Sequence, residues 1–319
     1  PENFLRRIKS LITGEHIKQA QHPGFWKANP LLYMNEIDNP YQHPPGKPFI
    51  WTQGRQVGGR SLTWGGITLR LSDREFKCNL IDGFGPNWPI NHKDLSTHYS
   101  KLEKEFKVHG KKDNLEQLPD GDYQKEIPLN ETEEEFANNV RIKLNFPVIN
   151  SRGFDYYNSN LHGPWPLYSS PGSSLKNAYE TRKVKILSNH IVERILMSKD
   201  RNSAEGVIAI DKLNKVRKKL YAKLIIVCAS TIQTNRLLLD SEENAQENGF
   251  IDPSKTLGCF LMDHISTCRF FLMPEKPKIS KKIQSNSSKV LSGAGSFFIP
   301  FGTNFQNPDE IDFLRGYGL

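Results

Sequence analysis

The run from Leu224 to Cys228 restricts the fold more than any other feature of the sequence. Its five consecutive apolar residues predict a strand that is buried on both faces of a sheet. The small residues Ala229 and Ser230 then predict a tight turn, and 231–239 predicts a helix with apolar residues on one face. A buried strand, a tight turn and a helix in this order indicate an α/β fold.

The turn at Ala229 and Ser230 lies where α/β proteins bind cofactors. In open α/β sheets, ligands bind beyond the carboxyl ends of the strands. The positive end of a helix dipole also attracts phosphate or an electron-rich ring. Both residues are therefore candidate cofactor contacts. An ordinary strand–turn–helix unit without a ligand gives the same pattern, and the pattern alone favours that simpler interpretation.

Other segments predict a mixture of short strands and helices. The expected strands are 184–187, 191–197, 207–210 and 216–221, with a turn at 199–202. The expected helices are 94–108, a helix that begins at a capping box of Thr132 and Glu135, and a short helix that Ser174 caps and that runs through Glu180. Alternating apolar and polar residues after Thr267 predict further sheet.

The segment 54–66 is rich in glycine and carries few charges. Paired glycines such as Gly58 and Gly59 leave backbone N–H groups bare, so that a pyrophosphate can approach them. Ser61 would add a hydroxyl donor, and a neighbouring arginine would balance the phosphate charge. The candidate contacts are Arg55, Val57, Gly58, Gly59, Ser61, Thr63, Trp64 and Gly65. A tight turn around a buried Trp is the alternative, and composition does not decide between the two.

The adjacent Asp263 and His264 fit an acid–base role. A single histidine after apolar residues is more often a structural hydrogen-bonding group, and we favour that interpretation. Neither a G-x-G-x-x-G nor a G-x-S-x-G pattern occurs in the sequence. The cysteines show no zinc-binding spacing, so no metal is expected.

The sequence has a net charge of +8. Such an excess can attract nucleic acid or an anionic surface, but a solvated basic surface is the commoner explanation, and we expect no nucleic-acid partner. No run of about eighteen apolar residues occurs, so no membrane-spanning helix is expected. The four cysteines form no C-x-x-C pair, and Cys228 is expected to be a small core residue. Free thiols predict a cytoplasmic protein, although the count also allows two disulfides.

Five blocks of sequence, taken in order, resemble the glucose–methanol–choline (GMC) oxidoreductases. They are Val57-Gly58-Gly59-Arg60-Ser61, Trp88-Pro89-Ile90 with Asp94-Leu95 and Tyr99, Ile191-Val192, Ile226 to Leu239, and Gly258 to His264. Each block is weak alone, but their common order is a specific signal. Thr63-Trp64 and the segment Phe313 to Gly318 resemble the branch of pyranose oxidases and gluconate or fructose dehydrogenases.

The resemblance implies an FAD-dependent oxidoreductase that oxidises a CH–OH group of an alcohol, polyol or sugar by hydride transfer to the flavin. The glycine block would contact the flavin pyrophosphate, the Val192 backbone would meet the adenine, and Asp263 would lie on the cofactor side. Pyranose oxidases bind their flavin through a histidine where this chain has Thr63 and Leu62. We therefore expect non-covalent FAD and a small-molecule substrate.

The resemblance also implies a domain plan. A Rossmann-like FAD-binding domain would comprise 50–80 and 173–266, a sheet-containing substrate domain 81–172 and 267–319, and a connecting segment 1–49. The family's G-x-G-x-x-G segment has no counterpart, and its active-site histidine is expected beyond Leu319. This chain alone, a central portion of such a protein, is thus expected to be inactive. The alternative is a truncated, non-catalytic GMC-like fragment that acts as a binding or scaffold piece.

Overall fold

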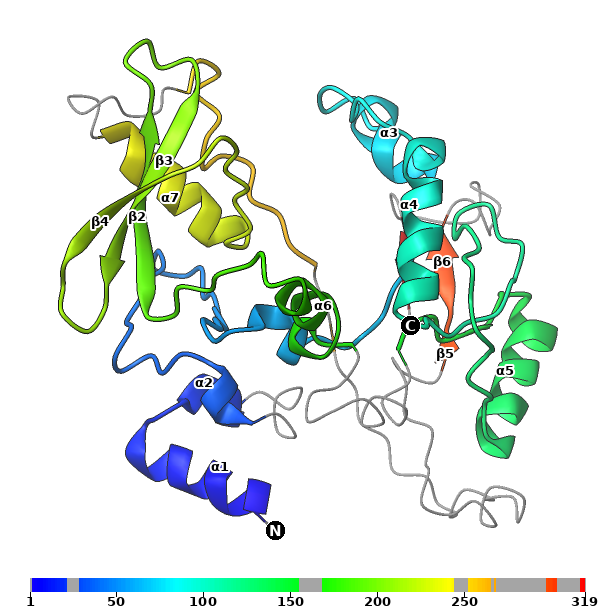
Figure 1. Ribbon diagram of the computed structural model, residues 1–319. Coiled ribbons are helices and arrows are strands. Elements are labelled where there is room, and N and C mark those ends of the chain that lie inside the picture. The colour runs from blue at the N-terminus through cyan, green and yellow to red at the C-terminus, as the bar shows by residue number, and fades with distance from the viewer. Residues whose placement is uncertain are drawn as a thin grey trace. The chain divides into compact units, whose positions relative to one another are not determined.

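The computed structural model describes residues 2–21, 29–154, 168–243, 252–264, 267, 297–302 and 316–318 (Figure 1). The α-helices are α1 (Glu2–Thr13), α2 (Ile17–Gln21), α3 (Asp73–Ile81), α4 (His92–Glu105), α5 (Glu131–Leu144), α6 (Ser174–Glu180) and α7 (Thr231–Glu243). The strands are β1 (Ile149–Asn150), β2 (His190–Met197), β3 (Ala204–Asp211), β4 (Arg217–Tyr221), β5 (Phe297–Phe298), β6 (Pro300–Gly302) and β7 (Gly316–Gly318). Short 3-10 turns include η2 (Pro30–Leu32), η3 (Gly59–Leu62) and η5 (Ser170–Gly172). The mixture of helices and small sheets is consistent with an α/β fold.

The chain divides into two units. Pro1–Val184 together with Met273–Leu319 forms the first, and Lys185–Leu272 forms the second. The strand pairs β1–β5 and β6–β7 belong to the first unit, and the three-stranded sheet β2–β3–β4 belongs to the second. The functional domain plan expected from the sequence stays a prediction.

The main apolar core of the first unit lies between α5 and the β1–β5 pair. Its buried residues are Leu129, Ala137, Val140, Val148 and Ile299. Phe136 on α5 stacks on Phe297 of β5 with ring centroids 5.3 Å apart. Helix α5 begins at a capping box of Asn130 and Glu133, two residues before the predicted box. The Asn130 side chain accepts the Glu133 N–H at 2.9 Å, whereas the expected partner Thr132 is already helical.

Two further helices of the first unit are capped in the same way. Helix α4, expected at 94–108, begins after Asn91, whose side chain accepts the Asp94 N–H at 3.2 Å. Helix α3 was not predicted, although Ser72 and Glu75 form the S-x-x-E pattern that marks a helix start. Helix α1 was also missed, in the segment expected only to connect.

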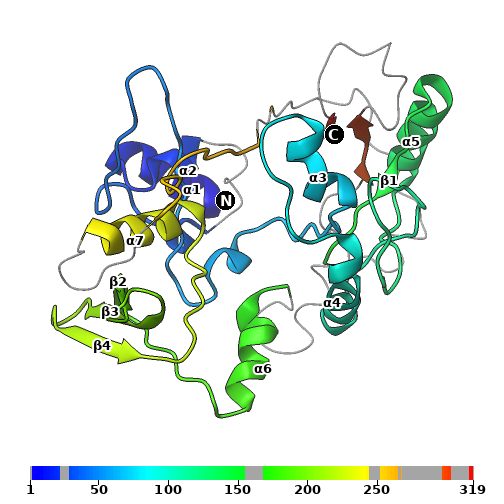
Figure 2. The same cartoon turned by 90° about the horizontal axis from the view of Figure 1, so that it is seen from above.

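The second unit is an antiparallel meander with a helix on it (Figure 2). Strand β3 pairs with β2 on one side and with β4 on the other, as the predicted strands require. The Ser241 hydroxyl of α7 is fully buried and accepts the Ile195 N–H of β2 at 3.0 Å. Ile195, Ile208 and Ala209 are buried in this unit.

The prediction of a buried strand at Leu224 to Cys228 was wrong. The segment is not a strand, and the exposed fractions of Leu224 and Ile226 are 75% and 76%. Cys228, expected in the core, is exposed as well. A strand buried on both faces needs hydrogen-bonded neighbours, and within the described residues no strand pairs with this segment. The strand expected at 184–187 is likewise not formed.

Several predictions concern regions that the described residues cover only in part. Strands β5, β6 and β7 agree with sheet after Thr267, and most other residues of that region lie outside the described ranges. Cys78, Cys228 and Cys259 are free, and Cys268 lies outside the described residues. Among the described helices, none combines the length and the apolar composition that crossing a bilayer requires.

Candidate functional site

The glycine loop of the first unit, residues 58–62, is a single 3-10 turn entered through two left-handed glycines. Gly58 has φ of 98° and Gly59 has φ of 52°, a conformation that side chains disfavour. The Gln56 carbonyl accepts the Gly59 N–H at 2.9 Å, and the Gln56 side-chain amide donates to the Gly59 carbonyl at 3.0 Å. The loop is therefore held in one defined shape.

The two glycines of this loop have different surroundings. A β-carbon on Gly58 would lie 2.7 Å from Cγ of Pro171 and 3.0 Å from Cδ1 of Leu62. A β-carbon on Gly59 would meet no atom within 4 Å. Gly58 is thus required by packing inside the protein. Gly59 leaves the space beside its Cα open, so a ligand can approach this part of the loop, while its own N–H and carbonyl are bonded to Gln56.

The Ser61 side chain closes the glycine loop instead of pointing away from it. Its hydroxyl donates to the Gly58 carbonyl at 2.5 Å and accepts the Ser170 N–H at 2.9 Å. Ser61 therefore ties the loop to η5. Its role as a hydrogen-bond donor to a phosphate group stays a prediction.

Trp64 follows the glycine loop and is fixed by two contacts. Its Nε1 donates to the Tyr168 carbonyl at 3.2 Å, and its ring meets the Phe154 ring edge-on at 5.4 Å. The other predicted residues of this segment line the same stretch of surface. Arg55, Val57 and Gly65 are exposed, and Thr63, half-buried, ends the 3-10 turn.

Tyr33 is a buried neighbour of this segment that no sequence motif indicates. Burial raises the pKa of its hydroxyl, while the Arg60 charge and a hydrogen bond with Thr63 oppose that rise. Its main-chain N–H donates to the Pro30 carbonyl at 3.0 Å, so η2 holds it in place. The phenol thus stays in its neutral form near the glycine loop.

The end of the glycine-rich segment is paired with residues 152–154. The Thr68 N–H donates to the Arg152 carbonyl at 2.9 Å, and the Phe154 N–H donates to the Gly66 carbonyl at 3.1 Å. Phe154 also carries the contact with Trp64. Residues 66–68, which follow the glycine loop and Trp64, are therefore fixed to the 152–154 segment.

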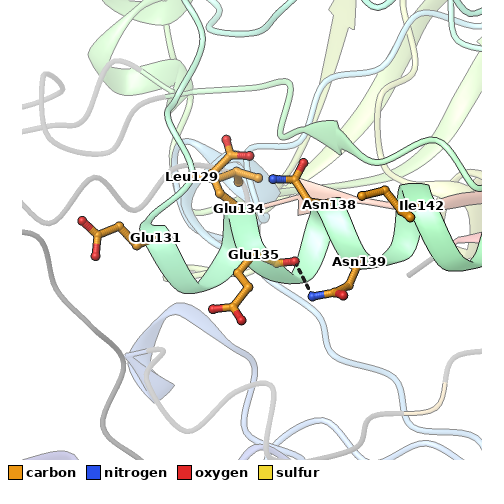
Figure 3. A pocket seen from close by; sticks show the side chains of 7 residues that line it. All are labelled: Leu129, Glu131, Glu134, Glu135, Asn138, Asn139 and Ile142. Atoms are coloured by element: carbon orange, nitrogen blue, oxygen red, sulfur yellow. Dashed lines mark hydrogen bonds between the residues drawn. The ribbon is translucent and has the colours of Figure 1, made fainter.

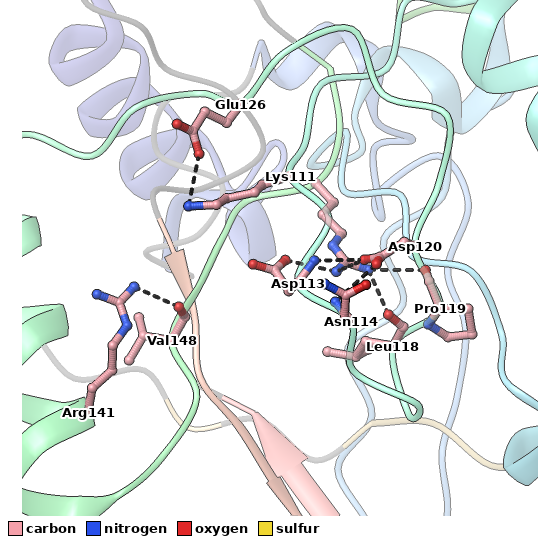
Figure 4. A network of polar contacts seen from close by, with 10 residues as sticks. Lys111, Asp113, Asn114, Leu118, Pro119, Asp120, Glu126, Arg141 and Val148 are labelled. Atoms are coloured by element: carbon pink, nitrogen blue, oxygen red, sulfur yellow. Dashed lines mark hydrogen bonds and ion pairs between the residues drawn. The ribbon is translucent and has the colours of Figure 1, made fainter.

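Arg152 anchors that segment through charges, and the residues that its side chain contacts, Asp113, Leu118, Pro119 and Asp120, lie close together in Figure 4. Its side chain is fully buried, and Nη2 lies 2.8 Å from one carboxylate oxygen of Asp113 and of Asp120. Its Nη1 donates to the Leu118 and Pro119 carbonyls at 2.9 and 3.1 Å. A buried guanidinium with two carboxylates and two carbonyls makes a rigid support. No local motif marks this arginine, and the sequence did not predict its role.

A second buried arginine joins α4 to the neighbouring loop. Arg70 forms an ion pair with Glu103, which is the largest cause of a raised pKa of Arg70. The Glu103 carboxylate also accepts the Asp122 N–H at 2.7 Å. Lys104, the largest cause, lowers the pKa of Asp122 through a hydrogen bond. Helix α4 and residues 120–122 are therefore linked by charges.

The remaining predicted contacts lie in the second unit. Val192 is on β2, 43% exposed, next to a break in the β2–β3 register between Val192 and Arg194. Ala229 and Ser230 are exposed and precede α7, and Ser230 has a left-handed φ of 67°. Its carbonyl accepts the Thr234 N–H at 2.8 Å, which starts the helix.

Asp263 and His264 are also exposed and touch each other. Asp263 accepts the His264 N–H at 2.7 Å, and Nδ1 of His264 lies 3.7 Å from Oδ1 of Asp263. The side chains of both residues stand in solvent. A candidate base needs a defined position beside its substrate, and no enclosing residues give His264 one within the described part of this unit.

A surface hollow of about 480 Å³ lies along α5 in the first unit (Figure 3). It is lined by Leu129, Glu131, Glu134, Glu135, Asn138, Asn139 and Ile142. None of the residues predicted to contact a cofactor is among them. Its acidic wall suits a phosphate group poorly, so the glycine loop is the stronger site for such a ligand.

Comparisons with known proteins confirm the family to which the sequence motifs point. A family model described as GMC oxidoreductase matches residues 42–266, which includes the glycine loop, β2 to β4 and α7. The fructose dehydrogenase large subunit of Gluconobacter japonicus is 23% identical over 311 residues, covering 91% of this chain and 52% of that protein. The chain thus spans about half the length of this relative. Because the family match covers more than half of its residues, the chain belongs to the GMC oxidoreductase family.

Proposed function

We propose that the glycine loop holds the pyrophosphate of FAD. The observation that carries this proposal is the open space beside the Cα of Gly59, where a β-carbon added to the residue would have no atom within 4 Å. The exposed Arg55 lies beside the loop and would balance phosphate charge. Trp64 contacts Tyr168 and Phe154 and so provides a rigid aromatic surface near the same segment. The residues present therefore fit the group.

In the second unit, we propose that Val192, Ala229, Ser230 and Asp263 contribute the other cofactor contacts. The register break beside Val192 frees backbone groups from the β2–β3 ladder. The exposed turn at Ala229 and Ser230 leaves its backbone accessible ahead of α7. A Rossmann-like arrangement of these elements is part of the same proposal.

The proposed activity is oxidation of a CH–OH group in an alcohol, polyol or sugar. Bound FAD supplies the hydride acceptor for this oxidation. A sugar is the favoured substrate class, because the relative named above is a fructose dehydrogenase. This chain's residues would bind and orient the cofactor. Removal of the hydroxyl proton requires a base in a fixed position beside the substrate. His264 is too exposed to be held in such a position.

We further propose that the flavin is bound without a covalent link. Thr63 occupies the position of the linking histidine, and the nearby Tyr33 is buried and engaged with Thr63. Acid precipitation of the flavin-loaded protein should release all colour to the supernatant. Colour that stays with the pellet would show a link to a residue of this chain.

The test of the main proposal is the flavin content of the protein as its gene encodes it. The purified protein should be yellow with flavin absorbance, and it should reduce a dye with at least one member of a panel of sugars, polyols and alcohols. A colourless, correctly folded protein that ignores added FAD would defeat the proposal.

The second candidate is a non-catalytic binding or scaffold piece. It is favoured by the lack of a G-x-G-x-x-G pattern in the sequence and by the exposed segment from Leu224 to Cys228, with which none of the described strands pairs. The coding sequence around this segment discriminates between the two candidates. An in-frame upstream G-x-G-x-x-G and a downstream histidine motif support the enzyme, and a stop codon on both sides supports the scaffold.

A further inference from the structure

Strands β3 and β4 form a hairpin (Figures 1 and 2) whose sequence is rich in lysine and arginine. Residues 212–223 contain no Asp or Glu. Their six cations are Lys212, Lys215, Arg217, Lys218, Lys219 and Lys223. This stretch of twelve residues therefore carries a charge of +6, against +8 for all 319 residues.

The tip of this hairpin is a defined structure. The Asp211 carboxylate accepts the Leu213 N–H at 2.9 Å, and the Asn214 side chain accepts the Val216 N–H at 3.0 Å. The Asp211 N–H also donates to the Val216 carbonyl at 3.0 Å, which closes the loop. Leu213 is held at this tip between two lysines with 78% of its surface exposed.

Acidic neighbours neutralise only part of the charge. Arg217 pairs with Glu193 at 2.8 Å, and Lys218 lies 3.9 Å from Asp211. For Lys212, Lys215, Lys219 and Lys223, no carboxylate of the described residues comes within ion-pair distance. Lysines on an edge strand also discourage aggregation. That function does not explain cations in the turn, or an exposed leucine between them.

We propose that this hairpin binds an anionic lipid surface. Clustered lysines attract the headgroups of an anionic leaflet. Leu213 at the tip would enter the boundary between headgroups and acyl chains, as apolar residues of peripheral proteins do. Nucleic acid would match the charge but would leave the leucine without an apolar environment. The combination of unpaired lysines and an apolar tip therefore selects a membrane surface, independently of flavin binding.

The test is cosedimentation of the whole chain with lipid vesicles. The chain should bind vesicles of phosphatidylcholine with about 30 mol% phosphatidylserine, should bind pure phosphatidylcholine weakly, and should lose binding as salt rises from about 0.1 to 0.5 M. Equal binding to both vesicle types, or binding that ignores salt, would overturn the proposal.

Two variants locate the surface. Lys212→Glu with Lys215→Glu should lower the bound fraction at least about fivefold, because two attractions become two repulsions. The matched control is Lys101→Glu with Lys112→Glu, an equal charge change at exposed positions of the first unit, which should lower binding less than about twofold. Equal losses in the two double variants would mean that total charge, and not the hairpin, causes binding.

Leu213→Ser tests the apolar tip without a change in charge. It should lower binding about two- to threefold, because one aliphatic side chain no longer enters the membrane. It also serves if the double variant fails to fold, as judged by far-UV circular dichroism. An unchanged bound fraction for Leu213→Ser would contradict the lipid surface. The lipid surface would also be contradicted if a hairpin variant lost its binding to a DNA oligonucleotide but kept its binding to vesicles.

Discussion

The glycine loop at Gly58–Leu62 and the segment Leu224–Ser230 are both predicted to contact the cofactor, yet they are held in opposite ways. The loop is closed by its own hydrogen bonds. The nearby 152–154 segment is held by the buried ion pairs of Arg152. The segment exposes Leu224 and Ile226, and no strand pairs with it within the described residues. A glycine loop can thus be fixed by local hydrogen bonds, while an apolar segment stays exposed because none of the described strands pairs with it.

Arg152→Met should have the largest effect on stability. It leaves Asp113 and Asp120 without their buried partner, which should cost about 3–5 kcal/mol of the free energy of unfolding. The matched control is Arg141→Met, because Arg141 is partly exposed and its nearest carboxylate is 3.9 Å away. Hydrogen exchange should quicken around residues 66–68 for Arg152→Met alone. Equal losses for the two variants would contradict the proposed support of the loop.

Gly58→Ala should rank second. The new β-carbon would lie 2.7 Å from Pro171 in a left-handed backbone, and the two penalties together should cost about 2–4 kcal/mol. Gly59→Ala carries only the backbone penalty, because no atom lies within 4 Å, and should cost about 1 kcal/mol. Urea denaturation measures both. Equal costs would show that the two glycines do not differ as described.

Ile226→Ala tests the open segment. The side chain is 76% exposed, so the substitution should change the free energy of unfolding by less than about 0.5 kcal/mol. Ile208→Ala is the matched control in the same unit, where 4% exposure predicts a cost of about 2–5 kcal/mol. A cost for Ile226→Ala near that of Ile208→Ala would mean that the segment is covered in solution.

The smallest expected effect is acid sensitivity of the meander. A hydrogen bond from Arg217 is the largest cause of a lowered pKa of Glu193. A lowered folded-state pKa stabilises the fold above the unfolded-state pKa, and this contribution is lost as the pH falls through the folded value. Carbon-detected NMR should therefore find Glu193 titrating below an ordinary Glu. Arg217→Met should return its pKa to that range, and no change would mean that the pair is absent in solution.

The sequence predicted the elements that depend on local pattern. Helix α7 and strands β2, β3 and β4 follow from apolar spacing. Helix α6 ends at Glu180 as expected, but its N-cap is Ser173, one residue before the predicted cap Ser174. Burial was predicted less well, because it depends on neighbours. The apolar run at Leu224 has the composition of a central strand, but no strand in the described ranges lies beside it as a partner.

The support of the candidate site could not be predicted in the same way. Arg152 pairs with carboxylates 39 and 32 positions away, at Asp113 and Asp120, and no motif relates them. The glycine pair itself was visible as a phosphate-binding pattern. Which glycine serves packing and which faces open space depends on Pro171, far along the chain, and required the structure.

The most direct test of the central claim is an FAD titration of the whole chain and two glycine variants. Because the sequence lacks a G-x-G-x-x-G segment, we expect weak but saturable binding, followed by quenching of flavin fluorescence. Gly59→Val should raise the dissociation constant about tenfold or more, since its side chain would occupy the space proposed for the pyrophosphate. Gly46→Val, at another left-handed glycine with no atom within 4 Å, should leave the constant unchanged. Equal constants for the chain and Gly59→Val would contradict the claim that this loop faces the phosphate.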